Sequence, residues 1–414
     1  MTHSGPAPIP GTRLPQGDIA TALQAAALEL DAGHYAAARD GYEQALLAAP
    51  ASRPAHAGLY YALTALGERH AAANHLAQAL LLQSIVALPY RGPRNGTVEP
   101  VRVLLLQSIN AGNVLIQRLL DDHIFATSVL IVEFYQPGTP LPPHDVVLNA
   151  IGDADIRVDA LDAAQCILIQ TRAPVLNPVH AVLATTRCRN AERLASLPGV
   201  RTARTVEFSR AALRSKRTTA MLARHGLSFP LLLRAPGYHM GQYFVHAESP
   251  NAIAAALAEF PEEIQRIIAI EYLDGRGEDG LTRKYRVLFI EDKLYPVHLA
   301  ASDNWKIHYF SAAMALHPER RNEDARFLAD MAGVLGSQAM TALAAIRDVL
   351  ALDYAGIDFG MDRDGNLLLY EANANMAVIR PGPEPMWDYR RPAIERIHQA
   401  VHQMFIKTAR APDG

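Results

Sequence analysis

The apolar residues follow different patterns in successive parts of the chain. From Asp18 to about Gln83 they recur at helical spacing among many alanines, whereas from Val101 onward they form short continuous runs separated by polar segments. Short apolar runs bounded by polar residues are typical of buried strands. Near the end, two such runs are joined by a polar turn in "DYAGIDFGMDRDGNLLLYEANAN". The pattern therefore predicts a helical region followed by regions of mixed helix and strand.

The helical region repeats itself at an offset of 34 residues. Four pairs of identical residues match at this offset: Gly33 with Gly67, Ala38 with Ala72, Ala45 with Ala79, and Leu46 with Leu80. The region resembles a pair of tetratricopeptide repeats, in which small residues lie where helices cross. An Ala-rich bundle with a chance period is the alternative. We expect a disordered Pro- and Gly-rich tail over residues 1–17, then a helical domain over residues 18–95.

The pattern of apolar runs in the next region, residues 100–205, predicts a small parallel α/β sheet. Its expected strands are "VRVLLLQS", "SVLIVEFY", "DVVLNAIGDAD" and "CILIQT", with a helix expected at "NVLIQRLLDD". Ligands bind at the loops after such strands, here "QSINAGN" and "NAIGDAD". Neither loop contains a glycine-rich or P-loop phosphate motif, so this sheet is not a self-sufficient nucleotide site.

The third region comprises residues 206–410. Its sequence predicts a phosphate-binding element. A helix with Lys216 precedes the strand "FPLLLR", which ends at Arg234 and continues into the loop "APGYHMGQ" with His239 and Gly241. A cation followed by a glycine-containing turn offers both charge and backbone N–H groups to a phosphate, although such a turn is also common in simple hairpins. Further strands are expected at "IIAIEYLDG", "RKYRVLFI" and "EDKLYPVHLAAS", and a long helix between about Glu323 and Leu350.

Three oxygen-bearing side chains converge in the final hairpin. Glu371 and Asn373 leave the same face of one strand, and Asp358 lies on the partner strand. Such a set suits Mg²⁺, which takes carboxylate oxygens together with phosphate oxygens and water. A calcium-binding EF-hand beginning at Asp362 is excluded, because Leu367 stands where that loop needs Gly. A plain hairpin turn with solvated acids remains the alternative.

Composition narrows the classes of function. The chain has 414 residues, a formal net charge of -3 and two cysteines, Cys166 and Cys188. This charge gives no general attraction to nucleic acid, and two cysteines are too few for a disulfide framework. The N-terminus lacks a signal peptide, and no apolar run reaches membrane-spanning length. We therefore expect a cytoplasmic protein that binds neither nucleic acid nor membranes.

The order of these motifs resembles the ATP-grasp superfamily, which includes D-alanine:D-alanine ligase and RimK-like ligases. The resemblance covers about Val101 to Ala409, and the hairpin with Asp358, Glu371 and Asn373 is its most specific part. It implies an α+β fold: an ATP-grasp domain over residues 206–410, a pre-ATP-grasp α/β domain over residues 100–205, and the all-α repeat domain before them. It also implies a ligase that joins a carboxylate to an amine through an acyl phosphate.

The resemblance assigns roles to particular residues. It implies ATP and two Mg²⁺ ions, replaceable by Mn²⁺, with the metal ligands Asp358, Glu371 and Asn373. Lys216, Arg234, His239 and Gly241 would contact phosphates, and Arg234 stands where relatives usually have Lys. The hinge residues Glu271, Tyr272 and Leu273 would meet adenine, and Glu278 or Asp279 the ribose. Arg286 would stabilise the transferred phosphoryl group.

The substrate is predicted only as a class, an amino acid or a short peptide. Lys306, His308 and Arg380 are candidates for holding carboxylate or phosphoryl oxygens, with Arg380 counted as catalytic, while Trp305, Tyr309 and Trp387 suit either packing or a lid. The helical repeats predict a surface for a protein partner or for a homodimer. A nucleotide-binding adaptor with an inactive core is the alternative function.

Overall fold

The Ala- and Leu-rich N-terminal sequence forms four helices, α1 (Gln16–Asp31), α2 (Tyr35–Ala48), α3 (Arg53–Ala65) and α4 (Arg69–Leu82). The structure is a computed structural model and describes residues 16–94, 99–238, 241–307, 313–374 and 376–411. Helix α1 thus begins two residues before the expected start at Asp18, and the rest of the predicted tail lies outside the described residues. Consecutive helices pack on one another, and α1 also packs on α3.

The 34-residue period is visible in the backbone of these helices. Gly33 and Gly67 both follow a helix with positive φ, 79° and 83°, a conformation that glycine adopts without strain. The alanines that repeat at the same offset, Ala38, Ala72, Ala45 and Ala79, are all buried. The two halves therefore share their turns and their small core positions, while the tetratricopeptide assignment stays a prediction. The compact N-terminal unit comprises the chain to Ala87, including β1 (Ile85–Ala87), and Val129–Pro140.

The second unit contains the rest of the chain and begins with a parallel arrangement of strands. Strand β2 (Val101–Gln107) pairs with β4 (Val146–Asn149), which pairs with β5 (Val175–Leu176). Strand β3 (Phe125–Ile131) lies on the other side of β2 and runs into Val129–Pro140 of the first unit. The short 3-10 helices η1 (Ile116–Arg118) and η2 (Val132–Phe134) flank β3 in the sequence.

Two expectations for this region were wrong. The segment "CILIQT" begins in the last turn of helix α5 (Val158–Leu168), whose buried residues Ala160, Ala164 and Ile167 follow helical spacing, and continues as a turn after it. The segment "NVLIQRLLDD" forms only η1, because the side chain of Asn113 bonds to the backbone of Ser108, and the N–H of Val114 donates to the carbonyl of Ala150. Helices α6 (Val179–Leu183) and α7 (Arg187–Leu194) complete the region.

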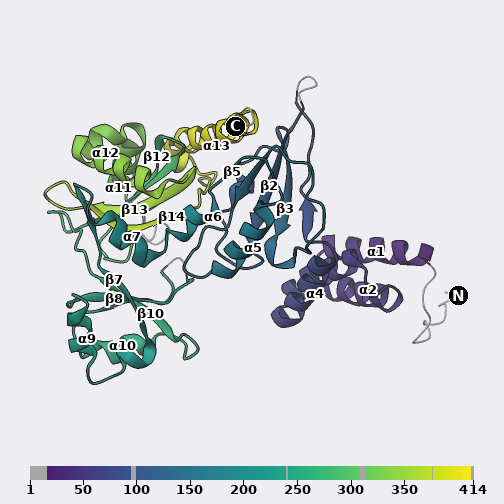
Figure 1. The fold of residues 1–414 in the computed structure, drawn as a ribbon, viewed down its shortest axis with the longest axis horizontal. Coiled ribbons are helices and arrows are strands. Elements are labelled where there is room, and N and C mark those ends of the chain that lie inside the picture. Colours follow the sequence, from purple (N-terminus) through teal and green to yellow (C-terminus); the bar gives the residue numbers. More distant parts are fainter. Residues whose placement is uncertain (1–15, 95–98, 239–240, 308–312, 375, 412–414) are drawn as a thin grey trace. The chain divides into compact units, whose positions relative to one another are not determined.

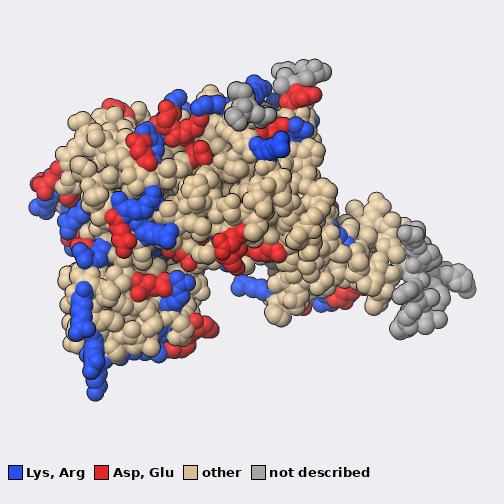
Figure 2. All heavy atoms as spheres, viewed as in Figure 1, with Lys and Arg blue, Asp and Glu red and all other residues tan. Residues whose placement is uncertain are grey.

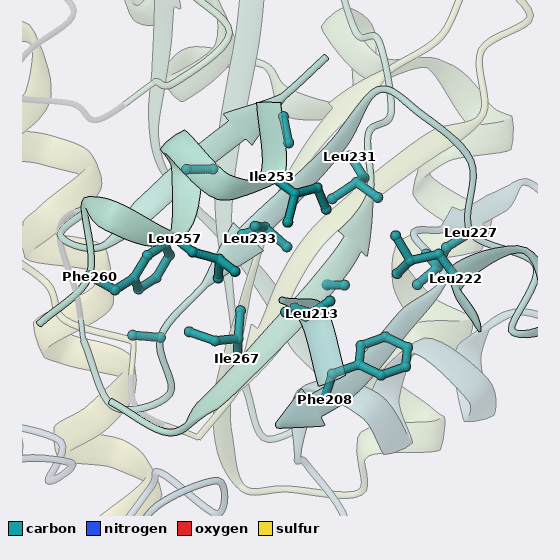
Figure 3. Close-up of a cluster of buried hydrophobic side chains, with 14 residues drawn as sticks. Phe208, Leu213, Leu222, Leu227, Leu231, Leu233, Ile253, Leu257, Phe260 and Ile267 are labelled. Carbon is teal, nitrogen blue, oxygen red and sulfur yellow. The ribbon is translucent and has the colours of Figure 1, made fainter. Parts of the chain in front are cut away.

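A four-stranded antiparallel sheet follows, in the order β7 (Thr205–Ser209), β10 (Arg266–Glu271), β8 (Leu231–Arg234) and β9 (Phe244–Ala247). The short helices α9 (Thr218–Arg224) and α10 (Ala252–Ala258) lie beside it (Figure 1), and α8 (Arg210–Leu213) packs on β7. Leu213, Leu222, Leu231, Ile253 and Leu257 point into one apolar cluster (Figure 3). This sheet therefore has a core of its own.

A five-stranded sheet carries the hairpin of interest. Its order is β12 (Lys293–Ser302), β11 (Thr282–Ile290), β13 (Tyr354–Met361), β14 (Leu367–Asn373) and β6 (Val200–Thr202). Strand β6 pairs in parallel with β14, so the segment that we assigned to the α/β domain contributes an edge strand here. Helix α13 (Arg391–Ala409) packs on β12 and β11, after the 3-10 helix η4 (Pro385–Arg390).

The expected single helix between Glu323 and Leu350 is broken between α11 (Pro318–Ala329) and α12 (Met331–Leu350), and Gly336, with φ 79° and ψ 167°, kinks α12 again. Asp330 separates them, because its side chain accepts a hydrogen bond from the N–H of Gly333 and thus caps the start of α12. Within the described residues, no single helix has the length and hydropathy needed to cross a membrane. Helices α11 and α12 meet that test only when taken together, across a 63° bend.

One face of the described residues carries charges of both signs. Figure 2 shows Lys and Arg side chains interspersed with Asp and Glu on the visible face of the described residues. Such a mixture fits the formal net charge of -3 and gives no broad field of one sign on that face.

Asp324 in α11 is a buried carboxylate that ties three elements together. It accepts hydrogen bonds from the N–H of Leu299, at 2.7 Å, and from the hydroxyl of Tyr389, at 2.7 Å, and lies 3.6 Å from Arg390. Burial outweighs these partners and raises the pKa of Asp324 from 3.8 to about 6. The folded protein therefore binds an extra proton between these two pH values.

We expect Asp324→Asn to remove a pH dependence of stability. Because the folded-state pKa is raised, this carboxylate makes the free energy of unfolding fall as pH rises from about 4 to about 7, by up to about 3 kcal/mol. Urea unfolding of both proteins across this range measures the difference. Asp303→Asn is the control, since the hydrogen bond from Arg320 lowers the pKa of Asp303 and predicts a trend of opposite sign. If the free energy of unfolding of the wild type, relative to that of Asp324→Asn, increased with pH, the raised pKa of Asp324 would be contradicted.

Candidate active site

One row of charged side chains crosses four strands of the five-stranded sheet. His298 on β12 is opposite Arg286 on β11, Arg286 is opposite Asp358 on β13, and Asp358 is opposite Glu371 on β14. Cross-strand partners project from the same face, so the four groups lie side by side. The sheet thus supplies one cation followed by two carboxylates, beside an imidazole whose pKa burial and Arg286 hold well below its ordinary value.

Two β-bulges flank this row. Strand β12 has one residue more than β11, at Val297, and β14 has one residue more than β13, at Tyr370. A bulge places two consecutive residues opposite one and redirects their side chains. Val297 and His298 consequently both line the same cavity, as do Tyr370 and Glu371, which regular alternation would prevent.

Asp358 is held by two cations. Its carboxylate accepts from Nζ of Lys284 at 2.9 Å and from Nε and Nη2 of Arg286 at 2.6 and 2.9 Å. Burial alone would raise the pKa of Asp358, but Arg286 and Lys284 hold it well below its ordinary value. The carboxylate is therefore ionised at any physiological pH, and it fixes both cations in place.

Glu371 has a different cationic partner. Its Oε1 atom accepts from Nη2 of Arg187 at 2.6 Å and from Nδ2 of Asn373 at 2.9 Å. Arg187 lies at the start of α7 and is also 3.6 Å from Asp155, in the loop after β4. Burial opposes ionisation, yet Arg187 and Arg234 lower the pKa of Glu371 to about 2. Arg187 thus connects the loop after β4 to the hairpin.

The charged row opens into a cavity of about 900 Å³. More cations than carboxylates line it among the described residues: Arg187, Arg234, Lys284, Arg286, Lys306, Arg380 and Arg390, against Glu271, Asp358 and Glu371. An excess of positive charge in a concave site suits a polyanionic ligand, because low-dielectric walls strengthen the attraction. The cavity therefore has the charge that a nucleoside triphosphate requires.

An aromatic group occupies another part of the cavity wall. The ring of Trp305 lies 5.3 Å from that of Phe244 and 6.4 Å from that of Tyr272, with His246 packed 5.3 Å from Trp305. Phe244, Tyr272 and Trp305 line the cavity together with Leu273. Aromatic faces of this kind can hold a planar heterocycle by stacking.

Arg234 and Lys306 lie where the small sheet meets this cavity. Arg234 donates to the carbonyl of Tyr238 at 2.8 Å, and Nζ of Lys306 donates to the carbonyl of Phe244 at 3.0 Å. Burial and the nearby Arg187 lower the pKa of Arg234 to about 10, so its side chain remains cationic at neutral pH. Gly241 has φ +75° and lies against the Lys306 side chain, where a Cβ would collide. Both cations therefore flank the predicted phosphate loop.

The donor set in the hairpin fits Mg²⁺. Oε2 of Glu371 accepts no hydrogen bond from the described residues, and Glu371 is ionised, so this oxygen is available to a metal ion. Asp358 has less spare capacity, since its two oxygens already take three N–H donors. The role of Asp358, Glu371 and Asn373 as metal ligands stays a prediction.

Solved structures similar to this chain include ATP-grasp ligases. D-alanyl-alanine synthetase A from Vibrio cholerae is 12% identical, with 75% of this chain and 99% of that one covered and a TM-score of 0.45. A RimK domain protein ATP-grasp from Sphaerobacter thermophilus is 15% identical, with coverages of 74% and 99% and a TM-score of 0.44. No protein-family model and no curated protein matches the sequence. A likeness at this level leaves the function to be argued from the residues themselves.

Most of the predicted site residues line the one cavity: Arg234, Gly241, Glu271, Tyr272, Leu273, Arg286, Asp358, Glu371, Asn373 and Arg380. Three others do not. Lys216 is exposed in the turn between α8 and α9, Glu278 is exposed between β10 and β11, and Asp279 pairs with Arg283 at 2.7 Å. The hydrogen bond from Arg283 lowers the pKa of Asp279 to about 2. Lys216, Glu278 and Asp279 thus lie outside the lining of this cavity, and their phosphate and ribose roles stay predictions.

His239, His308 and Tyr309 lie outside the described residues. Two residues that the sequence analysis missed are central: Arg187 and Lys284, which hold Glu371 and Asp358. The sequence indicates a site position for Lys284, because it lies two residues before Arg286 on a strand and both side chains therefore leave the same face. No local pattern indicates Arg187, because its contact with Glu371 spans 184 positions of the sequence.

Proposed function

We propose that this protein is an ATP-dependent ligase that joins a carboxylate to an amine. The observation that carries the proposal is the row of Arg286, Asp358 and Glu371 on the wall of a cation-rich cavity, with an aromatic surface beside it. In this proposal the acid pair would bind the metal, the cations would bind the phosphates and the aromatic surface would bind the base, all around one cavity. No nucleophilic side chain is needed, because both reacting groups belong to substrates.

The reaction proceeds in two steps. An oxygen of the substrate carboxylate attacks the γ-phosphorus of ATP, and the bond to the β-phosphate oxygen breaks to release ADP. The amine then attacks the acyl carbon, a C–N bond forms, phosphate leaves and the nitrogen loses a proton. Positioning and neutralisation of charge supply most of the catalysis in phosphoryl transfer.

Arg234 and Lys306 support the phosphates in this proposal, together with backbone N–H groups near Gly241. Tyr272, Trp305 and Phe244 hold the adenine ring by stacking, with Glu271 and Leu273 at its edge. Arg234 in place of the more usual Lys keeps the positive charge and offers a planar pair of donors.

Arg286 stabilises the transferred phosphoryl group, and Asp358 keeps its guanidinium in place. Glu371 and Asn373, with Asp358, would hold Mg²⁺, which when bound neutralises charge on the phosphate oxygens. Arg187 balances the charge of Glu371 from the side of α7. The substrates we propose are amino acids or short peptides, and a partner or second copy would bind the helical repeats.

The direct test is ADP and phosphate release from ATP and Mg²⁺ in the presence of paired amino acids and dipeptides. We expect ADP release that depends on both an acid and an amine, with an equimolar amide product detected by mass spectrometry. ATP binding without stimulation by any acid, surviving the double substitution Asp358→Ala and Glu371→Ala, would overturn the proposal.

Arg234→Met is expected to raise KM for ATP by about tenfold to about a hundredfold. The variant keeps the length of the side chain but removes a charged donor, and hydrogen bonds to charged groups contribute about 1.5–3 kcal/mol. Initial rates at varied ATP measure the effect. Arg224→Met, at the exposed end of α9, is the matched control and should leave KM for ATP unchanged. Equal KM values in the two variants would remove Arg234 from the phosphate site.

A further inference from the structure

Arg380 differs from the other cations of the cavity in the group that holds it. It is exposed at the cavity wall, in the segment after β14, and its Nη2 atom lies 3.3 Å from Nδ1 of His398 on α13. No carboxylate among the described residues pairs with it. The guanidinium therefore keeps an uncompensated charge facing the cavity.

The partner of Arg380 must act as an acceptor. A guanidinium has only N–H donors and stays protonated in proteins, so Nδ1 of His398 presents its lone pair and the imidazole is neutral. His398 is buried, and its burial, together with Arg380, lowers its pKa. A neutral imidazole orients the guanidinium without cancelling its charge.

Carboxylates hold the cations deeper in the cavity. Arg286 and Lys284 are paired with Asp358, Arg187 with Glu371, and Arg390 with Asp324. Arg234 and Lys306 bond to carbonyls, but both flank the phosphate loop. Among the described residues that line this cavity, Arg380 is thus the cation that is available to bind an anion other than the phosphates.

The neighbours of Arg380 indicate the kind of anion. Ile379 is next to Arg380 in the chain and lines the cavity, as do Met376 and Trp387, so an organic group next to the anion would meet apolar surface. A planar guanidinium pairs in a bidentate manner with a carboxylate, which is also planar. A phosphate in this cavity already has two other cations, Arg234 and Lys306, beside the predicted phosphate loop.

We propose that Arg380 binds a carboxylate of the amine substrate, and that His398 is the positioning residue that orients Arg380 for it. The inference rests on the proposed ligase function and narrows its substrate class. The amine is then an amino acid or a peptide with a free carboxylate, and not a simple alkylamine or an amide-capped peptide.

The first test compares each amine with its carboxamide. L-alanine, D-alanine and L-alanyl-L-alanine are assayed as amine substrates beside alaninamide of each hand and alanylalaninamide. We expect the wild type to favour the acid in kcat/KM by about a hundredfold, and Arg380→Met to reduce this preference to about twofold or less. Equal use of acid and amide by the wild type, or an unchanged preference in Arg380→Met, would overturn the inference.

The second test concerns His398. His398→Leu removes the acceptor, so KM for the acid should rise about tenfold while kcat and the KM for the amide stay within about twofold. His398→Asn restores an acceptor oxygen near the Nδ1 position and should recover most of the affinity. His402→Leu is the matched control one turn further along α13, since His402 bonds to the carbonyl of Leu119 and not to Arg380. The same KM change in His402→Leu, or no recovery in His398→Asn, would refute the positioning role.

Binding measurements distinguish a failure of the proposed ligase function from a failure of this inference. Calorimetry with alanylalanine and alanylalaninamide, in the presence of ADP and Mg²⁺, reports on Arg380 without turnover. Tighter binding of the acid to the wild type, lost in Arg380→Met, supports the carboxylate site even if no ADP is released. Equal affinity for the acid and the amide overturns it whatever the turnover assay gives.

Discussion

Glu371→Gln is expected to abolish ligation, by about a thousandfold or more in kcat, while leaving the protein folded. Glutamine has the shape of glutamate, and its amide oxygen can still accept from Arg187 and Asn373 as Oε1 does at 2.6 and 2.9 Å. What it lacks is the negative charge, which Mg²⁺ requires and which Arg187 balances. Loss of a group that stabilises charge in the transition state typically costs two to three orders of magnitude, and a metal ligand more.

Three measurements separate the explanations for that loss. Product formation is followed by mass spectrometry, folding by circular dichroism and thermal unfolding, and Mn²⁺ binding in the presence of ATP by electron paramagnetic resonance. We expect product formation and Mn²⁺ binding to be lost and folding to be unaffected. Asp364→Asn, in the exposed turn of the same hairpin, should behave as the wild type. Turnover of Glu371→Gln within about tenfold of the wild type would show that the metal assignment is wrong.

Arg210→Met is expected to lower the free energy of unfolding by about 3–5 kcal/mol. Arg210 is almost completely buried, and its guanidinium donates to the carbonyls of Leu257, Phe260, Pro261 and Ile264 at and after the C-terminus of α10. Terminal helix carbonyls have no partner within the helix. Met would keep the apolar packing on the cluster of Figure 3 but leave the carbonyls of Phe260 and Ile264 without a donor among the described residues, each at about 1–3 kcal/mol before relaxation, while those of Leu257 and Pro261 keep a backbone N–H.

The neighbouring Arg214 provides the matched control for Arg210. Arg214 pairs with Glu262 at 2.8 Å, but the Glu262 side chain is 73% exposed. Exposed ion pairs contribute about 0–1 kcal/mol, so Arg214→Met should change stability little. Urea unfolding followed by circular dichroism compares the two variants. Similar destabilisation by both substitutions would mean that Arg210 is not the residue that satisfies these carbonyls.

The sequence predicted the strands that carry the site better than it predicted the helices. Alternation and turn residues are local, and the pairing of β13 with β14 was confirmed with Asp358 directly opposite Glu371. The apolar run "CILIQT" was assigned to a strand, because a short run does not distinguish a strand from the buried side of a helix. The break at Asp330 has a local signal, since this Asp lies three residues before Gly333 in a helix-capping position.

The missing parts of the site are those that depend on distant contacts. Arg187 reaches Glu371 from a helix in a different part of the sequence, and no local pattern marks it. Lys216 was assigned to the phosphates by its order along the chain alone, and the short helices α8 and α9 leave it exposed. The order of motifs along the chain predicts which helices and strands form. Which side chains enter the cavity depends on where the short loops end, and the order of motifs does not show this.

The bulges at Val297 and Tyr370 constrain how this hairpin can vary in length. Insertions in the turn between β13 and β14 lie beyond Tyr370 and leave the row of His298, Arg286, Asp358 and Glu371 in place. Deleting Tyr370 itself would remove the bulge and leave Asp358 opposite Glu371, but the second side chain that the bulge turns toward the cavity would be lost. Homologous chains that retain this chemistry should therefore differ freely in the length of that turn, but keep the bulged residue next to Glu371.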